Sequence, residues 1–484
     1  MSENLFDLLT ANQKDIVHFV FNKLETAGYE VYIIGGAVRD LLLGRSIKDI
    51  DLTTNATPDE IRRVFKDYPI INNNGEKHGT VTVRYNEENI EITTYRIDGE
   101  YKDNRHPESV EFTKDIVKDL ARRDFTINAM AYTGGDTVLD PVGGLKDLKD
   151  GIVRAVGDPR KRFAEDALRI LRMIRFASVL DFNISQSTLE CGWLLRKTLS
   201  YISKERIREE INKMIIGPGF ARLATNYYVM DILSEVLPIR NMFHFDQKNP
   251  AHLWDLWTHT LHVLKYSMEQ LEIKDYKLAL AALFHDIAKP YTKTAELDEN
   301  GEFVRFHFPD HPRQSANIVE KWLREYKYSM QEITYIKTLV LLHDEREFAD
   351  CNRTKIKLLL NKLATAINST NKTQINGLFG YLAILKDSDV RDHDYSNTKY
   401  KDIKWLNTNQ LVNLAQVVKE DNVCYLLKDL AINGNDLIEL GVKPGPAIKD
   451  LLEECLNDVI NGKIENTKII LIDKVKHKLI NKLN

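Results

Sequence analysis

Residues 31–54 read VYIIGGAVRDLLLGRSIKDIDLTT, a run that passes from an apolar strand through two glycines into a helical pattern. The strand VYII and the periodic segment AVRDLLLG predict a strand-turn-helix unit. Gly35 and Gly36 allow the backbone to turn tightly and to present N–H groups at a helix N-terminus to a triphosphate. Arg39 would add a forked cationic donor. The segment therefore predicts a phosphate-binding turn.

Two aspartates close this segment in a β-like run. Asp49 and Asp51 are two residues apart, so on a strand both carboxylates project from the same face. Magnesium prefers oxygen ligands, and two ions held by shared carboxylates stabilise the attacking and leaving oxygens of phosphoryl transfer. Glu91, in the strand-like NIEITTYR, is the candidate third acid because a neighbouring strand could present it to the same face. We expect Mg²⁺ and catalysis at these three acids.

A simpler interpretation of each feature exists. Two spaced aspartates are more often a solvated strand end, and two glycines after a strand also occur in Rossmann-like turns. The sequence lacks GxGxxG, however, and a Rossmann-like turn would leave the paired acids unexplained. The combination favours a metal-dependent phosphoryl-transfer site.

The composition is that of an ordinary globular chain. It has 484 residues, 43% of them hydrophobic, and a formal net charge of -4, which neither predicts nor excludes a nucleic-acid partner. The acidic N-terminus MSENLFDLLTANQKD does not have the charge of a signal peptide, and no apolar run approaches the ~20 residues that span a bilayer. We expect a cytoplasmic protein without a membrane segment. The four cysteines are far apart and form no CxxC pair, which favours reduced thiols.

The pattern of apolar residues changes along the chain. Short β-rich runs alternate with polar turns up to about residue 150, which predicts a small α/β domain. Helical spacing then dominates, as in KERIREEINKMII, and the region from about 244 to 400 holds nine of the thirteen histidines. The last block ends in KVKHKLINKLN, whose lysines fall on one side of an amphipathic pattern and could lie along an anionic partner. We therefore expect four domains, at residues 1–152, 153–240, 241–400 and 401–484.

Four motifs, in this order, resemble one family. GGAVRDLLLGRSIKDIDLTT, LARRDFTINAMAY, DPVGGLKDLKDGIVRAVGDP and RFAEDALRILRMIRFA are similar to segments of the bacterial-type (class II) tRNA nucleotidyltransferases and their poly(A) polymerase relatives. The late segment AINGNDLIELGVKPGPAIKDLLEECLNDVINGKIEN resembles the family's C-terminal body. The resemblance implies a polymerase-β-like α/β head followed by a mostly helical neck, HD and body or tail domains. It also implies addition of C and A to the tRNA 3′ end from CTP and ATP.

The same resemblance assigns roles to residues. It implies metal binding by Asp49 and Asp51, and nucleotide contacts from Gly36, Arg39 and Arg123. It further implies base recognition by Asp166 and Arg169 and triphosphate binding by Arg172 and Arg175. The polar segment DGEYKDNRHPESVEF resembles the flexible loop that the family uses to switch from C to A.

The spacing and chemistry of one group bear on base choice. Asp166, Arg169, Arg172 and Arg175 are three residues apart, so on one helix they would form a stripe; solvated arginines on an amphipathic helix are the alternative. Cytosine and adenine both present an amino donor beside a ring-nitrogen acceptor, which an aspartate and an arginine complement. Uracil and guanine would leave those groups unpaired, at about 1–3 kcal/mol each. The pair would therefore reject UTP and GTP without a template.

Six residues of the histidine-rich block resemble a second type of site. WTHTLHVL, AALFHDIAKP, PDHPRQSA, VLLHDER and DSDVRDH are similar to segments of HD-type metal-dependent phosphohydrolases. Imidazole and carboxylate ligands suit Mn, Fe, Co, Ni or Zn, and a bridged pair of such ions can generate hydroxide near neutral pH. His252 and His262 are alternatives for the first ligand, and each histidine alone could be a core or surface residue. The predicted ligands are His259, His285, Asp286, His311, His343 and Asp389.

Three other functions fit parts of the pattern. A poly(A) polymerase would share the same head but extend RNA repeatedly with ATP, and another enzyme of the type adds only the final A. In a different class, an HD phosphohydrolase could use its N-terminal domain only to sense nucleotides. If the HD site is active, a terminal or cyclic phosphate at an RNA 3′ end is its expected substrate.

Overall fold

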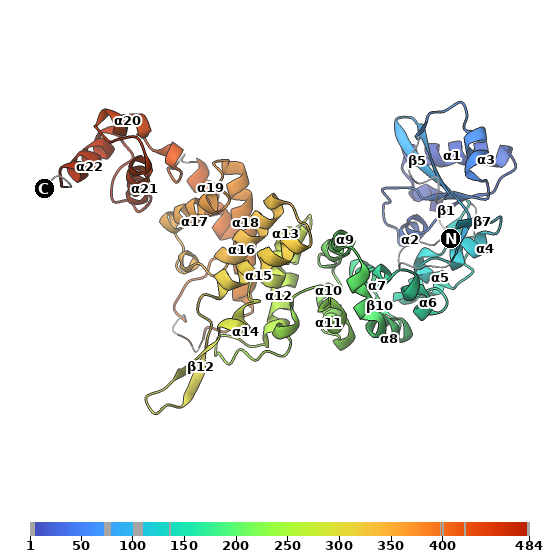
Figure 1. Ribbon diagram of the computed structural model, residues 1–484, viewed down its shortest axis with the longest axis horizontal. Helices are drawn as coiled ribbons and strands as arrows, with labels where there is room; N and C mark the ends of the chain where they lie inside the picture. The colour runs from blue at the N-terminus through green and yellow to red at the C-terminus, as the bar shows by residue number, and fades with distance from the viewer. Residues whose placement is uncertain are drawn as a thin grey trace. The chain divides into compact units, whose positions relative to one another are not determined.

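The chain folds into two compact units, Met1–Leu237 and Pro238–Asn484 (Figure 1). The structure is a computed structural model and describes residues 5–71, 79–99, 110–134, 137–396, 398, 401–420 and 423–481. Most of the predicted switch segment, residues 100–109, lies outside this described part. Within the described part, no helix is both long enough and apolar enough to cross a membrane.

A mixed six-stranded sheet forms the base of the first unit. The strand order is β3-β4-β5-β2-β1-β8. Strand β1 is antiparallel to both of its neighbours, while β2 and β5 run parallel. The apolar side chains of Ile33, Val81 and Ile92 are fully buried. The strands are β1 (Val31–Ile34), β2 (Leu52–Thr54), β3 (Ile70–Ile71), β4 (Thr80–Tyr85), β5 (Glu88–Thr94) and β8 (Ala131–Tyr132).

The register of this sheet positions the paired acids. Strand β2 begins at Leu52, so Asp49 and Asp51 lie in the segment that leads into the strand and not within it as the sequence suggested. The backbone at Asp51 is nevertheless tied to the sheet, because the N–H of Ile34 donates to its carbonyl at 3.0 Å. Leu52 is opposite Ile92 in the parallel pair, which brings the residue before each, Asp51 and Glu91, to the same edge.

Helices precede, separate and follow the strands along the chain of the first unit. Helix α1 begins with a capping box in which Thr10 and Gln13 each bond the other's backbone N–H. Beyond the sheet, α7 contacts α9 and α10, and α6 contacts α8. The helices are α1 (Ala11–Thr26), α2 (Gly36–Leu42), α3 (Pro58–Val64), α4 (Ile116–Ala121), α5 (Gly144–Asp150), α6 (Pro159–Glu165), α7 (Leu168–Leu180), α8 (Gln186–Leu195), α9 (Lys204–Met214), α10 (Phe220–Leu223) and α11 (Tyr227–Leu233). Two short ladders, β6 (Arg96–Asp98) with β7 (Val110–Phe112) and β9 (Ile152–Val153) with β10 (Asn183–Ile184), add to this unit.

The expected arginine stripe does not begin where the sequence placed it. Helix α6 ends at Glu165 and α7 begins at Leu168, so Asp166 is in the turn between two helices and not on one helix with the arginines. The Asp166 backbone is extended, with φ −143° and ψ 106°, and its carboxylate accepts the N–H of Leu168 at 3.0 Å. This local bond competes with helical hydrogen bonding, as is common for aspartate.

The second unit is largely helical. Helix α13 contacts α12 and α16, and α18 contacts α12 and α16. These four helices lie side by side in Figure 1. A hairpin of β11 (Thr294–Leu297) and β12 (Phe303–His307) separates α14 from α15. The helices are α12 (Leu256–Glu269), α13 (Tyr276–Phe284), α14 (Lys289–Thr292), α15 (His311–Glu325), α16 (Met330–Leu342), α17 (Arg353–Ala366), α18 (Lys372–Arg391), α19 (Thr408–Glu420), α20 (Gly434–Glu439), α21 (Pro446–Ile460) and α22 (Lys468–Asn481).

Residues 474–481 of the basic C-terminal segment lie in helix α22, which packs on α21. Two of its lysines are paired within the fold: Lys474 with Asp458 and Lys478 with Glu454. Less of its positive charge is therefore free for an anionic partner than the sequence pattern suggested.

Candidate active site and metal centre

The glycine turn holds the start of helix α2 against an arginine. Gly35 has φ +69°, in the left-handed region that glycine adopts without strain. A Cβ atom at this position would lie 2.8 Å from Nη1 of Arg123 and 3.8 Å from Oδ2 of Asp51. The close approach of the turn, the guanidinium and the carboxylate thus requires glycine here, and it places three predicted site residues together.

The acids share one electrostatic environment. The pKa of Asp51 is raised from its ordinary value, chiefly because surrounding protein atoms replace part of its water. Arg123 lowers this pKa, whereas the negative charges of Asp49 and Glu91 raise it further. Carboxylates that repel one another in this way are suited to a divalent cation, which would neutralise them. The residues present therefore fit the predicted Mg²⁺.

Arg39 is buried and fixed in direction. Its Nε and Nη2 donate to the two oxygens of Asp40 at 2.9 and 2.8 Å, and its Nη1 donates to Oδ1 of Asn128 at 2.6 Å. Its guanidinium lies 5.1 Å from the centre of the Phe176 ring. Gly36 is beside it, since a Cβ atom there would be 3.5 Å from Nη2 of Arg39. The Arg39 guanidinium is thus held beside Gly36, the first residue of α2.

The two predicted base-recognition residues each have a partner within the protein. Arg206 of α9 donates to the carboxylate of Asp166, with Nη2 to Oδ2 at 2.8 Å. Arg169 donates to Glu165 at 2.6 Å and to the carbonyl of Arg162 at 3.1 Å. These contacts fix where the two side chains point, so a nucleotide would meet oriented groups.

The remaining arginines of α7 are not simply solvated. Arg172 forms an ion pair with Asp124 at 2.5 Å, and Arg175 pairs with Glu210 of α9 at 2.5 Å. Both guanidinium groups also lie against the Phe176 ring, at 5.2 and 3.9 Å from its centre. Carboxylates on neighbouring elements thus hold both of these cations.

Sequence reasoning did not identify the residues that hold these arginines. Asp124 and Asn128 lie within the motif LARRDFTINAMAY, which could have drawn attention to them. Arg206 and Glu210 are on α9, about 40 residues from their partners, and carry no local signal. Their roles become apparent only from the packing of α9 beside α7.

The six residues predicted in the histidine-rich block come together in the second unit. His259 is on α12, His285 and Asp286 follow α13, His311 begins α15, His343 follows α16 and Asp389 is near the end of α18. All six are buried. Their ligand atoms form two groups, within each of which the atoms lie within 4.8 Å of one another: His259, His285 and Asp389, and Asp286, His311 and His343.

The imidazoles are oriented through their Nδ1 atoms. Nδ1 of His285, His311 and His343 bonds the carbonyl three residues earlier, at 2.8, 2.8 and 2.7 Å. Nδ1 of His259 instead bonds Asp392 at 2.9 Å. A hydrogen bond at one ring nitrogen fixes the ring and leaves the other as a lone-pair donor, which is the usual arrangement for metal-binding histidines. Four Nε2 atoms therefore face the cluster.

Asp286 joins the two groups. Its Oδ2 is 3.2 Å from Nε2 of His285, and its Oδ1 is 3.1 Å from Nε2 of His311 and 3.4 Å from that of His343. Lys289 contacts the same carboxylate at 2.6 Å. A carboxylate between two sets of imidazoles is suited to bridge two transition-metal ions. The residues fit such a pair.

Charges around the centre shift its pKa values. Although burial alone would lower it, hydrogen bonds to Asp389 and Asp392 raise the pKa of His259 to about 9. The pKa of Asp286 is held well below its usual range because Lys289 and His285 outweigh the opposing effect of burial. The two carboxylates thus favour the protonated form of His259, with which a metal ion would compete for Nε2.

A pocket of about 620 Å³ opens onto the cluster. Its lining includes Asp286, His311, His343 and Asp389. Four cationic side chains also line it: Lys289, Arg305, Arg346 and Lys386. Four acidic side chains, Asp286, Asp344, Glu345 and Asp389, line it as well, so charges of both signs face the pocket.

The sequence and the fold have counterparts among known proteins. A family model described as the Poly A polymerase head domain matches residues 31–154, and one described as a putative tRNA nucleotidyltransferase domain 2 matches residues 313–475. A CCA-adding enzyme of Lactobacillus helveticus is 36% identical over 375 residues, which cover 72% of this chain and 92% of that protein. One of Limosilactobacillus reuteri is 31% identical over 471 residues, 94% of this chain and 95% of that protein. The chain belongs to the family of CCA-adding enzymes.

A solved CCA-adding enzyme shares the architecture. The crystal structure of the Bacillus stearothermophilus CCA-adding enzyme in complex with CTP has a TM-score of 0.66 and 25% identity, and the match covers 98% of this chain and 99% of that one. Membership in the CCA-adding enzyme family agrees with the predicted nucleotidyltransferase head and helical neck. The HD assignment of the histidine-rich block stays a prediction.

Proposed function

We propose that this CCA-adding enzyme builds or repairs the CCA end of tRNA from CTP and ATP, releasing pyrophosphate. The observation that carries the proposal is the family membership together with the turn at Gly35, where Arg123 and Asp51 meet. We place the reaction in the cytoplasm, and we assign tRNA binding to residues 153–240 and 401–484. An RNA helix would be recognised there by its backbone and shape.

The residues divide the chemistry between them. Asp49 and Asp51, with Glu91 beside them, would hold Mg²⁺, which neutralises charge on the triphosphate when bound. Arg39 and Arg123 would position phosphate or ribose groups. The primer 3′-oxygen attacks the α-phosphorus, a new P–O bond forms, and the bond to pyrophosphate breaks. In-line positioning and charge stabilisation account for most of the rate enhancement in such transfers.

Base choice is assigned to Asp166 and Arg169. An accepting carboxylate and a donating guanidinium complement the edges of cytosine and adenine and not those of uracil and guanine. Arg206 and Glu165, which hold the two side chains in place, would keep this pair oriented. We expect Asp166→Ala combined with Arg169→Ala to relax exclusion of UTP and GTP by at least tenfold, measured as relative incorporation. Unchanged preference would contradict the assignment; Arg324→Ala, on an exposed pair with Glu320 outside the regions assigned to tRNA, is the control.

Extension of tRNA lacking CCA tests the activity itself. CTP and ATP are supplied separately and together, and the products are sized. We expect two C residues with CTP alone and a complete end with both. Long A tails without C would indicate a poly(A) polymerase, and growth only on tRNA that already ends in CC would indicate addition of the final A alone.

We further propose that the histidine-rich block is a metal-dependent phosphohydrolase of the HD type. Asp286 between two groups of imidazoles is the specific observation that favours it, and a pocket of about 620 Å³ adjoins the cluster. When bound, a transition-metal pair would supply hydroxide near neutral pH. Asp286 would hold both ions, and Lys289 and Lys386 would attract the phosphate. A terminal or cyclic phosphate at an RNA 3′ end is the expected substrate.

Paired variants separate the two activities. Asp49→Ala with Asp51→Ala should abolish nucleotide addition and leave phosphodiesterase activity intact, whereas His343→Ala should do the reverse. Each activity is measured on both variants, with a cyclic-phosphate RNA end as the hydrolysis substrate. Nucleotide addition that survives loss of both aspartates would contradict the first assignment. Absence of any bound transition metal and of hydrolysis would contradict the second.

A further inference from the structure

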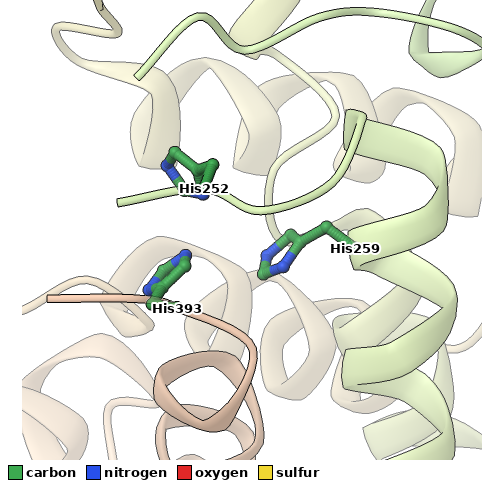
Figure 2. Close-up of side chains that lie close together, drawn as sticks. All are labelled: His252, His259 and His393. Atoms are coloured by element: carbon green, nitrogen blue, oxygen red, sulfur yellow. The ribbon is translucent and has the colours of Figure 1, made fainter. Parts of the chain in front are cut away.

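Two more histidines face the metal centre from outside the predicted set. His252 lies in the loop before α12, and His393 follows the end of α18. Together with His259 they form a third group whose ligand atoms lie within 4.8 Å of one another. Figure 2 shows the three rings turned toward a common space, from three separate parts of the chain. The rings of His259 and His393 are stacked with centres 5.2 Å apart, and those of His252 and His393 are 4.4 Å apart.

Both added histidines have a buried ring nitrogen without a hydrogen-bond partner. In His393, Nδ1 bonds the Tyr395 hydroxyl at 2.6 Å, which leaves Nε2 buried, unpartnered and 3.6 Å from Oδ1 of Asp389. In His252, Nε2 lies 3.4 Å from Nζ of Lys289, and Nδ1 is buried and unpartnered. A buried polar atom left without a partner costs about 1–3 kcal/mol, so two at one place indicate that a ligand completes them.

His259 cannot serve two metal ions at once. Its Nδ1 is held by Asp392, so a neutral ring has only Nε2 to offer. That nitrogen is 3.4 Å from Nε2 of His285 and 3.3 Å from Oδ1 of Asp389, which is the spacing of ligands around one ion. The same nitrogen belongs to a ring that faces His252 and His393. The two sets of ligands therefore share the single lone pair that His259 can offer.

We propose that His252, His259 and His393 form an outer position for a transition-metal ion, alternative to the inner position at His259, His285 and Asp389. The outer position is nearer the pocket, because both His252 and His393 line the pocket, whereas of the three inner ligands only Asp389 does. Its ligands are three imidazoles and no carboxylate, a set that suits Zn²⁺, Co²⁺ or Ni²⁺. An ion entering from the pocket would meet these rings first and pass to the inner position by exchange around His259.

The inference shares His259 with the proposed phosphohydrolase but does not depend on hydrolysis. It concerns how many ions the chain holds and which side chains hold them. A chain that binds two ions and hydrolyses nothing would contradict the proposed activity and leave this inference standing. The two can therefore fail separately.

Zinc content of full-length variants provides the test. His285→Ala removes an inner ligand. We expect this variant, dialysed against Zn²⁺ and analysed by mass spectrometry, still to hold two ions per chain, one at the outer position and one at Asp286, His311 and His343. Adding His252→Ala and His393→Ala should reduce the content to one. His244→Ala, which removes an exposed histidine of the same unit, should leave it at two.

One result overturns the proposal. If the zinc content of His285→Ala is the same with and without His252 and His393, those residues do not form a metal position. Circular dichroism checks that each variant keeps its helices. Should His285→Ala fail to fold, Asp389→Asn, which retains the side-chain volume, takes its place in the same comparison with the same expected ion counts.

Discussion

Gly35 makes a close approach that no other residue would permit. Its positive φ and the nearness of Arg123 act together, since an added Cβ would both strain the backbone and displace the guanidinium. Gly35 has both a positive φ and a close neighbour, so it can be compared with a glycine that has only the positive φ. Gly44 is that residue: it has φ +66° and no atom within 4 Å of an added Cβ.

Gly35→Ala is expected to reduce nucleotide addition by two orders of magnitude or more, because Arg123 must move away from Asp51. Gly44→Ala should lose only the backbone energy of about 1–2 kcal/mol. Steady-state extension rates and thermal unfolding are measured for both. Equal losses of activity in the two variants would show that the contact with Arg123 has no functional weight.

Several site residues could be predicted because their chemistry is local. Asp49 and Asp51 are two residues apart, and Gly35 and Gly36 follow a strand directly, so the pattern itself indicates a turn beside acids. His393 could not be predicted in this way. Its ring reaches the centre only because the chain after α18 returns to the loop that carries His252, with the two backbones forming an isolated antiparallel bridge.

At the scale of elements, helix α7 is held to its surroundings by ion pairs. Asp124, which precedes the short helical turn at Thr126–Asn128, accepts from Nε and Nη2 of Arg172 at 2.8 and 2.5 Å. Burial alone would raise the pKa of Asp124, but Arg172 outweighs it and lowers the pKa to about 2. The pair thus connects the head to the helix that carries the predicted triphosphate ligands.

This pair should contribute pH-dependent stability. Because the folded pKa of Asp124 lies below its unfolded value, its contribution is present above about pH 4 and is lost as the pH falls toward 2. Asp124→Asn should lower the unfolding free energy by roughly 2 kcal/mol at pH 7. The difference from the wild type should shrink between pH 4 and pH 2 in denaturant titrations. A difference independent of pH would assign the effect to packing.

The break between α6 and α7 shows that apolar periodicity does not indicate where one helix ends and the next begins. Apolar periodicity correctly indicated helix on both sides of Asp166. It did not indicate that the aspartate carboxylate would take the N–H of Leu168 and end one helix before the next begins. An aspartate side chain often accepts a hydrogen bond from the backbone N–H two residues later in the chain. This local preference could have indicated that Asp166 and the arginines are not on one helix.

At the scale of the molecule, the chain is two units of nearly equal length. The carboxylate site is confined to the first and the histidine centre to the second. Fragments 1–237 and 238–484 are therefore expected to fold separately. The second should bind transition metal as the full chain does, and the first should bind none.

Metal analysis and unfolding curves of both fragments measure this. The melting temperature of fragment 238–484 should fall on chelation, since metal binding stabilises only the folded state. Fragment 1–237 should be unaffected. A fragment 238–484 that is unfolded with metal present would show that the two units need each other.

The order of the parts was more predictable than their internal arrangement. Composition and motifs indicated an α/β head followed by helices, because strand and helix periods differ along the chain. The pairing of Lys474 and Lys478 with acids of α21 was not predictable from the amphipathic pattern, since it depends on which helix packs beside α22. A row of lysines on a helix indicates that acidic groups lie beside it, but not whether those groups belong to the same protein or to another molecule.

The backbone bridge between His252 and His393 also affects how the chain is connected outside the metal centre. The N–H of Asp394 also donates to the carbonyl of Ala251 at 3.0 Å, so the two ends of a segment of about 140 residues are fastened side by side. Within this segment, α17 and α18 also contact α19, which follows it, so the helices that come after the segment depend on it for their packing. The closed ends and these contacts together join the histidine-rich region to the helices that follow it.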